Sequence, residues 1–218
     1  MMGKLTARAI VERALEIGDA EGLDAVTIRR LAADLGVTPM ALYWHFKNKD
    51  QLLIGMADHL ILGFGVKGGD DRPWRDRLRE LVEGLVRVLR THPCAKNVLE
   101  QVDQGAVPSF LAVWNEALGL ARTAGFTVEE CCLISKYLLQ SAISIADAPV
   151  HFRPGHTSEE IAEIVRVKRL GLQSLPAEKY PNLVEMAGPM VAGMTADFYD
   201  SFGVDLVVSG VEALAARR

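Results

Sequence analysis

Apolar side chains recur every three to four residues along almost the whole chain, which is the spacing of one face of an α-helix. Alternation of apolar and polar residues, the pattern of a half-buried strand, is not sustained anywhere in the sequence. The pattern predicts helices over residues 5–21, 27–35, 38–44, 48–64, 74–90, 94–103, 108–125, 127–147, 157–173 and 195–216, with residues 176–188 as a connecting piece. We therefore expect an all-α fold.

The stretch from Gly63 to Pro73 is rich in glycine and aspartate and is the best candidate for a boundary loop. Its Gly63-x-Gly65-x-x-Gly68 spacing matches the dinucleotide-binding fingerprint, but that motif follows a strand, whereas this one follows a predicted helix. We interpret it as a helix stop and a loop. The chain as a whole is expected to form a compact bundle of residues 1–50 and a larger bundle of residues 51–218.

Residues 27–49 predict two short helices joined through Gly36, with a third helix ahead of them. This is helix-turn-helix geometry, and the turn glycine supplies the left-handed backbone that a steep crossing needs. Thr27 and Thr38 stand where helix N-caps are expected, and Pro39 suits a first helical position. The apolar residues lie at spacings that bury them against the preceding helix: Ile28, Leu31, Leu35, Val37, Leu42 and Phe46 against Ile10, Ala14 and Ile17.

The other face of the second short helix carries side chains with no evident core role. Met40, Ala41 and Trp44 are suited to contact thymine methyl groups. Tyr43 and His45 are suited to donate hydrogen bonds to phosphates. These residue types together favour a surface that meets DNA.

The charge of the chain is divided unequally between its two parts. The net charge of −4 for the whole chain, taken alone, argues against a nucleic-acid partner. Residues 27–49, however, carry a net charge of +3, and the acidity belongs to residues 51–218. Helix N-termini at Thr27, Thr38 and Asn48 add backbone N–H groups that suit phosphate.

One run in this segment carries a specific resemblance. The pattern G-V-T-x-x-x-L-Y-x-H-F-x-N-K stands here as Gly36, Val37, Thr38, Leu42, Tyr43, His45, Phe46, Asn48 and Lys49. Over about residues 5–60 the chain resembles the tetracycline-repressor (TetR) family of bacterial regulators. The resemblance implies an N-terminal three-helix DNA-binding domain, residues 1–50, and a larger helical domain for ligand binding and dimerisation, residues 51–218.

The resemblance also assigns roles in DNA binding. It implies that Tyr43 and Lys49 hold phosphates, as Thr27 and His45 do, and that Arg29 and the 38–44 helix read bases. For Arg29, a phosphate contact and an ion pair with Asp34 remain as alternatives. Specificity is expected to rest on Arg29, on methyl contacts and on DNA shape, because the start of the 38–44 helix has few hydrogen-bonding groups. The predicted DNA-binding residues are Thr27, Arg29, Thr38, Pro39, Met40, Ala41, Tyr43, Trp44, His45, Lys47 and Lys49.

Dimerisation and ligand binding are expected of the larger bundle. The 127–147 helix is apolar on all sides, and the 195–216 helix carries an apolar stripe, so both need cover. We expect a second copy of the chain to supply it, and the alternative is that both helices pack inside one chain. The resemblance places a ligand pocket inside the bundle. The candidate lining residues are Phe64, Val102, Asp103, Phe110, Trp114, Tyr137, Gln140, Ser141 and Ser144. Asp103 in such a pocket would favour a cation or an amine.

Together with these features, the resemblance implies a cytoplasmic repressor that a small molecule releases from palindromic operator DNA. The alternatives are a helical-bundle enzyme and an adaptor that binds only protein. Against an enzyme, the sequence has no Glu-x-x-His pair, no G-x-S-x-G and no His-Glu-x-x-His, so we expect no catalytic residue, no metal and no cofactor. The three cysteines form no disulfide framework, and no apolar run is long enough for a membrane span.

Overall fold

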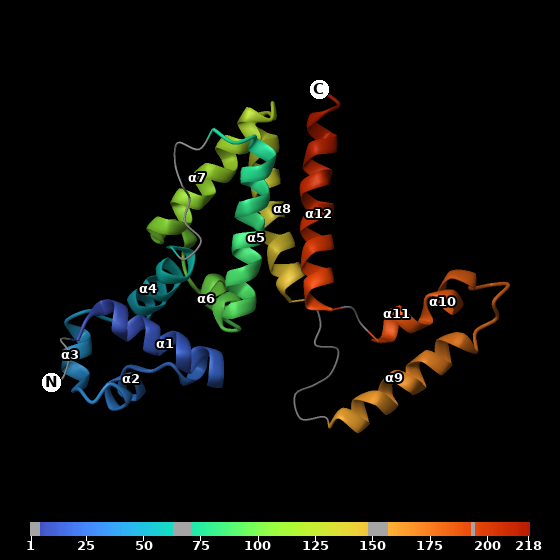
Figure 1. Cartoon of the computed structure of the whole chain (residues 1–218). Coiled ribbons are helices and arrows are strands. Elements are labelled where there is room, and N and C mark those ends of the chain that lie inside the picture. Colours follow the sequence, from blue (N-terminus) through green and yellow to red (C-terminus); the bar gives the residue numbers. More distant parts are fainter. Residues whose placement is uncertain (1–4, 63–70, 148–156, 193–194) are drawn as a thin grey trace. The chain divides into compact units, whose positions relative to one another are not determined.

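The computed structural model describes residues 5–62, 71–147, 157–192 and 195–218, and every regular element within these ranges is a helix (Figure 1). The prediction of an all-α fold is therefore confirmed. The α-helices are α1 Ala7–Glu21, α2 Ile28–Asp34, α3 Pro39–Tyr43, α4 Lys49–Leu62, α5 Trp74–Thr91, α6 Ala95–Gln101, α7 Pro108–Thr123, α8 Val128–Ala146, α9 Ser158–Gln173, α10 Pro181–Glu185, α11 Ala187–Ala192 and α12 Ala196–Ala215. Two 3-10 helices are η1 Leu23–Ala25 and η2 Gln104–Ala106.

The chain forms two compact units. One comprises Met1–Ala146 together with Gly203–Arg218, and the other comprises Asp147–Phe202. The first unit thus contains the helix-turn-helix segment and the helices α5 to α8. The division into functional domains at residue 50 stays a prediction.

Local capping interactions define where several helices begin. The Thr6 hydroxyl accepts a hydrogen bond from Ala9 N at 3.1 Å at the start of α1. A capping box is present at the start of α9, because Glu160 N donates to Thr157 Oγ1 at 3.2 Å and Thr157 N donates to Glu160 Oε2 at 2.7 Å. The same reciprocal pair forms between Thr127 and Glu130 ahead of α8.

The first hydrophobic core joins the helix-turn-helix segment to the helices that follow it. The predicted apolar residues of α1 to α3 are buried in it or pack against it, and the core continues through α4 and α6 to Phe110 of α7. A Cβ atom added at Gly55 of α4 would lie 2.8 Å from Phe46 Cε1, so α4 packs closely against the helix-turn-helix segment. The core therefore holds α4 against both the helix-turn-helix segment and the bundle.

The second core lies between α5, α7, α8 and the C-terminal part of α12. Its members include Val82 of α5, Ala142 of α8 and Val208 of α12, each 3% exposed or less. Arg79 of α5 forms an ion pair with Asp205 of α12 at 2.6 Å. This packing covers one side of α8, and Figure 1 shows α5, α8 and α12 running alongside one another.

One stretch differs from the sequence prediction. The connecting piece predicted over residues 176–188 contains α10 and the start of α11, and Pro181 occupies the first turn of α10, where its fixed φ is favourable. In the unit of residues 147–202, Ala187 is the sole buried residue among those the structure describes. None of the described helices combines the length and apolar character that a membrane span requires.

Candidate DNA-binding surface and ligand cavity

The turn between α2 and α3 has the geometry that the sequence predicts. Gly36 has a φ of +67°, a left-handed conformation that glycine adopts without strain. Thr27 Oγ1 accepts a hydrogen bond from Arg30 N at 3.1 Å, and Thr38 Oγ1 accepts one from Ala41 N at 3.4 Å. Pro39 occupies the first turn of α3. The two short helices are therefore fixed by local interactions at the turn.

The residues predicted to meet DNA form an exposed surface. Met40 is 67% exposed, Tyr43 46% and Trp44 85%, while Leu42 between them is fully buried. Large apolar side chains gain nothing for folding in such positions, so their exposure favours contact with a partner. Of the eleven predicted residues, Ala41 is half-buried and the rest are exposed: Thr27, Arg29, Thr38, Pro39, Met40, Tyr43, Trp44, His45, Lys47 and Lys49.

The structure separates the two neighbouring arginines of α2. Arg30 pairs with Glu21 at 2.8 Å and with Asp34 at 3.2 Å. Asp34 also accepts from Arg13 at 2.7 Å, and these hydrogen bonds, the one from Arg13 foremost, lower its pKa. Within the part of the chain that the structure describes, Arg29 pairs with no carboxylate. The alternative that Arg29 pairs with Asp34 is therefore wrong, because two other arginines occupy that carboxylate.

These pairs change how the local charge is distributed. The +3 of residues 27–49 counts Arg30, whose charge two carboxylates offset. The cations that remain for a phosphate-bearing partner are Arg29, Lys47 and Lys49. Lys49 Nζ donates only a long hydrogen bond, 3.5 Å, to the carbonyl oxygen of Leu23.

Polar contacts connect α1 and α4 to the bundle. Asp19 of α1 accepts from His92 Nδ1 at 2.7 Å and from Cys94 N at 3.0 Å, just after α5. Ser109, in the first turn of α7, donates its backbone N–H to Asp58 Oδ1 of α4 at 2.9 Å and its hydroxyl to Asp58 O at 3.2 Å. Helix α4, which follows the helix-turn-helix segment, is thus hydrogen-bonded to α7, the helix that carries Phe110.

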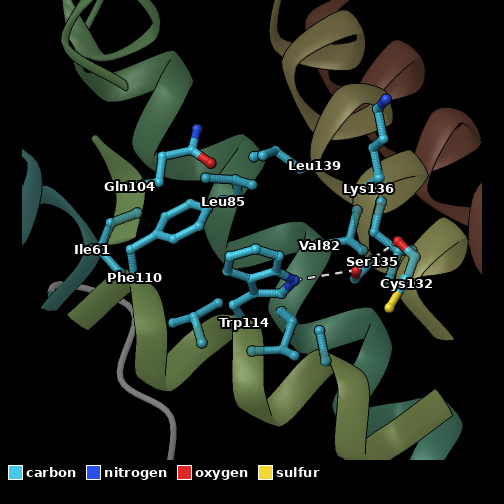
Figure 2. A pocket seen from close by; sticks show the side chains of 14 residues that line it. Ile61, Val82, Leu85, Gln104, Phe110, Trp114, Cys132, Ser135, Lys136 and Leu139 are labelled. Carbon is cyan, nitrogen blue, oxygen red and sulfur yellow. Dashed lines mark hydrogen bonds between the residues drawn. The ribbon is translucent and has the colours of Figure 1, made fainter. Parts of the chain in front are cut away.

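A cavity of about 270 Å³ lies between α4, α5, α7 and α8 (Figure 2). Its wall is mainly aliphatic and aromatic, and Phe110 and Trp114 meet edge to face, with ring centroids 6.1 Å apart. Trp114 Nε1 donates to Ser135 Oγ at 3.2 Å, and Ser135 in turn donates to the carbonyl oxygen of Cys132 at 3.0 Å. Apolar walls with few polar groups are typical of small-molecule sites.

Comparison with known proteins finds relatives of this chain among bacterial transcriptional regulators. A family model described as bacterial regulatory proteins, tetR family, matches residues 10–56. The transcriptional repressor DrrR1 of Streptomyces coeruleorubidus is 29% identical over 231 residues, which cover 98% of this chain and 80% of that protein. The class C tetracycline repressor of Escherichia coli is 41% identical over 80 residues, 36% of each protein.

Solved protein structures match this chain over nearly its full length. Apo ActR from Streptomyces coelicolor has a TM-score of 0.79 at 28% identity, covering 100% of this chain and 99% of that one. ActR in complex with actinorhodin has a TM-score of 0.77 at 28% identity, covering 98% and 99%. The chain belongs to the TetR family. Its helix-turn-helix segment is that of a DNA-binding transcriptional regulator, and its relatives in the TetR family are regulators rather than enzymes.

For this TetR-family chain, two of the predicted ligand contacts line the cavity. Phe110 and Trp114 do so, whereas Phe64 lies outside the described residues. The remaining candidates are absent from the cavity lining, and a role for them in ligand binding stays a prediction: Val102, Asp103, Tyr137, Gln140, Ser141 and Ser144. Asp103 instead accepts from Gly105 N at 3.0 Å and is exposed.

The cavity also contains residues that sequence reasoning missed. From α4 and α5 these include Ile61 and Leu85, from η2 Gln104, and from α8 Cys132, Ser135, Lys136 and Leu139. Gln104 is adjacent to the predicted Asp103, and the α8 residues lie on a different side of the helix from Tyr137, which is 64% exposed. Because α8 is apolar on all sides, no stripe in the sequence marks which side faces a cavity.

Proposed function

We propose that this regulator is a repressor that binds palindromic operator DNA as a homodimer and leaves it when a small molecule fills the cavity. The observation that carries the proposal is the position of α4. The helix begins at Lys49, directly after the reading segment, and its residue Ile61 lines the cavity. A ligand that binds one position of α4 better than another therefore changes the placement of the reading surface.

Similarity to named regulators supports the repressor role and the response to a ligand. DrrR1, similar over nearly the whole of this chain, is named a transcriptional repressor. ActR, with the same fold at 28% identity, has been solved both without ligand and in complex with actinorhodin. A regulator that acts on DNA operates in the cytoplasm of a bacterium, and we place this chain there.

Exposed apolar residues on α8 and α12 support dimerisation. Leu133 and Tyr137 of α8 are 55% and 64% exposed, and Leu206 of α12 is 66% exposed. A second copy of the chain would bury these side chains, which a single copy leaves exposed to solvent. A dimer then presents two reading surfaces, which suits half-sites about one DNA turn apart, ~34–36 Å.

DNA binding is tested with the promoter fragment beside the gene for this chain. Fluorescence anisotropy in a salt series is expected to show a steep fall of log affinity with log salt, because phosphate contacts release counterions. Met40→Ala on the reading surface is expected to weaken binding, whereas Met190→Ala, an equally truncating change at a residue 53% exposed on α11, is not. Absent binding, or a salt-independent affinity, would favour an adaptor that binds only protein.

Dimerisation is tested by light scattering after gel filtration. Leu206→Glu is expected to shift the protein to monomers and to abolish tight operator binding, because it places a charge in the proposed interface. Leu111→Glu on α7, a residue 44% exposed outside that surface, is the matched control and is expected to stay dimeric. Unchanged dimers of Leu206→Glu would contradict the role of α12.

A further inference from the structure

One basic side chain, that of Lys136, lines the cavity. Lys136 is the sole lysine or arginine among the residues that line it, and no carboxylate lines it within the described residues. Asp103, whose charge would favour a cation, is bonded to Gly105 N and is not part of the lining. The electrostatics of the site thus oppose a cationic ligand and favour an anionic one.

Most polar groups deeper in the cavity are already engaged. The indole N–H of Trp114 donates to Ser135, and the Ser135 hydroxyl donates to the Cys132 carbonyl. Gln104 Nε2 makes only a long bond, 3.5 Å, to Leu99 O. A ligand with polar groups buried beside Val82 or Leu85 would leave them without partners, which costs free energy. Its polar group therefore belongs at the rim, where Lys136 and Gln104 retain free donors.

The inner wall matches a flat ring system. Figure 2 shows Phe110 and Trp114 rising from α7 toward aliphatic side chains of α5 and α8. Their edge-to-face arrangement presents two ring surfaces inclined at 64°, against which an aromatic ligand packs with favourable quadrupole geometry. The volume of about 270 Å³ lies just below the usual range of ligand pockets, ~300–1,000 Å³, so the ring system must be compact.

We propose that the cavity takes a compact aromatic acid, with its rings against Phe110 and Trp114 and its anionic group at the rim beside Lys136. In Figure 2 the stem of Lys136 reaches the cavity wall and its ammonium group points away from the rings of Phe110 and Trp114. A lysine stem is a flexible four-carbon chain, so the ammonium group can turn toward an anionic group at the rim. The inference deepens the proposed function, since it rests on this cavity being the effector site. It replaces the cation or amine that Asp103 suggested from the sequence.

Three probes with one ring system and different charge test the ligand class. These are 2-naphthoate, 2-naphthamide and 2-naphthylmethylammonium, titrated by calorimetry into the full-length protein. We expect naphthoate to bind tightest and the ammonium compound weakest. Lys136→Met, which keeps the apolar stem, is expected to weaken naphthoate about fivefold and to leave the amide unchanged. Lys168→Met, a change at an exposed lysine of α9, is the matched control and leaves all three affinities unchanged.

Protection of a cavity thiol places the probe. Cys132 is exposed and lines the cavity, so bound naphthoate is expected to slow its reaction with a disulfide reagent. The proposal is overturned if the ammonium compound binds as tightly as naphthoate, if Lys136→Met weakens acid and amide alike, if Cys132 is not protected, or if naphthoate fails to bind at millimolar concentration.

Operator anisotropy with saturating naphthoate separates this proposal from the proposed function. Charge-selective binding together with operator release supports both. Charge-selective binding that leaves operator affinity unchanged supports the ligand class and counts against the cavity as an effector site. Release by all three compounds alike supports the effector site and refutes the preference for an acid.

Discussion

Helix α7 takes its N-terminal cap from another helix, and removing that cap has a calculable cost. Val107 precedes α7 without a capping side chain, and Pro108 has no N–H to donate. The first donor is therefore Ser109 N, which is bonded to Asp58 Oδ1 of α4 at 2.9 Å. Ser109 is 8% exposed, so water does not readily replace the carboxylate. We expect Asp58→Ala to destabilise the packing of α4 on α7, which connects the helix-turn-helix segment to the cavity.

The magnitude of the effect follows from two losses in Asp58→Ala. A buried N–H without a partner costs about 1–3 kcal/mol, and a lost negative charge at a helix N-terminus costs a further ~0.3–1 kcal/mol. We expect the free energy of unfolding to fall by about 2 kcal/mol. Asp58→Asn keeps an oxygen acceptor and loses only the charge, so its loss is expected to be about 0.5 kcal/mol.

Equilibrium urea unfolding at fixed protein concentration measures both variants, because the concentration fixes any contribution from dimerisation. Asp71→Ala, at an exposed aspartate outside every helix, is the control and is expected to stay within ~0.5 kcal/mol of the parent protein. If Asp58→Ala and Asp71→Ala unfold at the same urea concentration, the capping argument is refuted. If Asp58→Asn loses as much as Asp58→Ala, the charge rather than the hydrogen bond carries the interaction.

Three further measurements address the other features of the chain. Mass spectrometry after thiol labelling is expected to find Cys132 modified and Cys94 intact in the folded protein, because burial raises the pKa of Cys94 to about 12. Arg29→Ala is expected to cost about 1–3 kcal/mol of operator affinity and to relax sequence preference, whereas Arg30→Ala, whose side chain is occupied by Glu21 and Asp34, costs less, as anisotropy will show. Lys47→Ala is expected to make the slope of log affinity against log salt shallower by about 1 for each phosphate that the lysine neutralises in the complex.

The helix-turn-helix segment was predictable because its determinants are local. Thr27 and Thr38 bond to donors three residues away, and Gly36 has the positive φ that its place in the turn requires. Which charged side chains pair with one another was not predictable in the same way. The Arg13–Asp34 pair joins positions 21 residues apart, so it depends on how α1 packs on α2. A count of charges along the sequence treats Arg29 and Arg30 as equivalent. Packing distinguishes them, because among the described residues Arg30 pairs with Glu21 and Asp34 and Arg29 pairs with no carboxylate.

The cavity was predictable only in its aromatic wall, for a related reason. Phe110 and Trp114 are four residues apart on a helix that has a polar side, so their shared orientation is apparent from the sequence. The polar candidates on α8 are polar residues within an apolar run, and such residues tolerate contact with water. Gln140 and Ser144 are indeed exposed. The polar group that meets the indole is instead Ser135, whose need for a partner becomes visible only when Trp114 is placed beside it.

An apolar run that surrounds a helix thus has three different causes in α8. Ala142 is buried because α5 and α12 cover it, and Leu139 is apolar because it forms a cavity wall. Tyr137 is 64% exposed, and we assign its side to the partner copy. Since one helix carries all three surfaces, a ligand that shifts α8 at Leu139 is expected to shift Tyr137 with it. In the proposed dimer, α8 would therefore be a second route from the cavity to the spacing of the two DNA-binding surfaces, in addition to the route through α4.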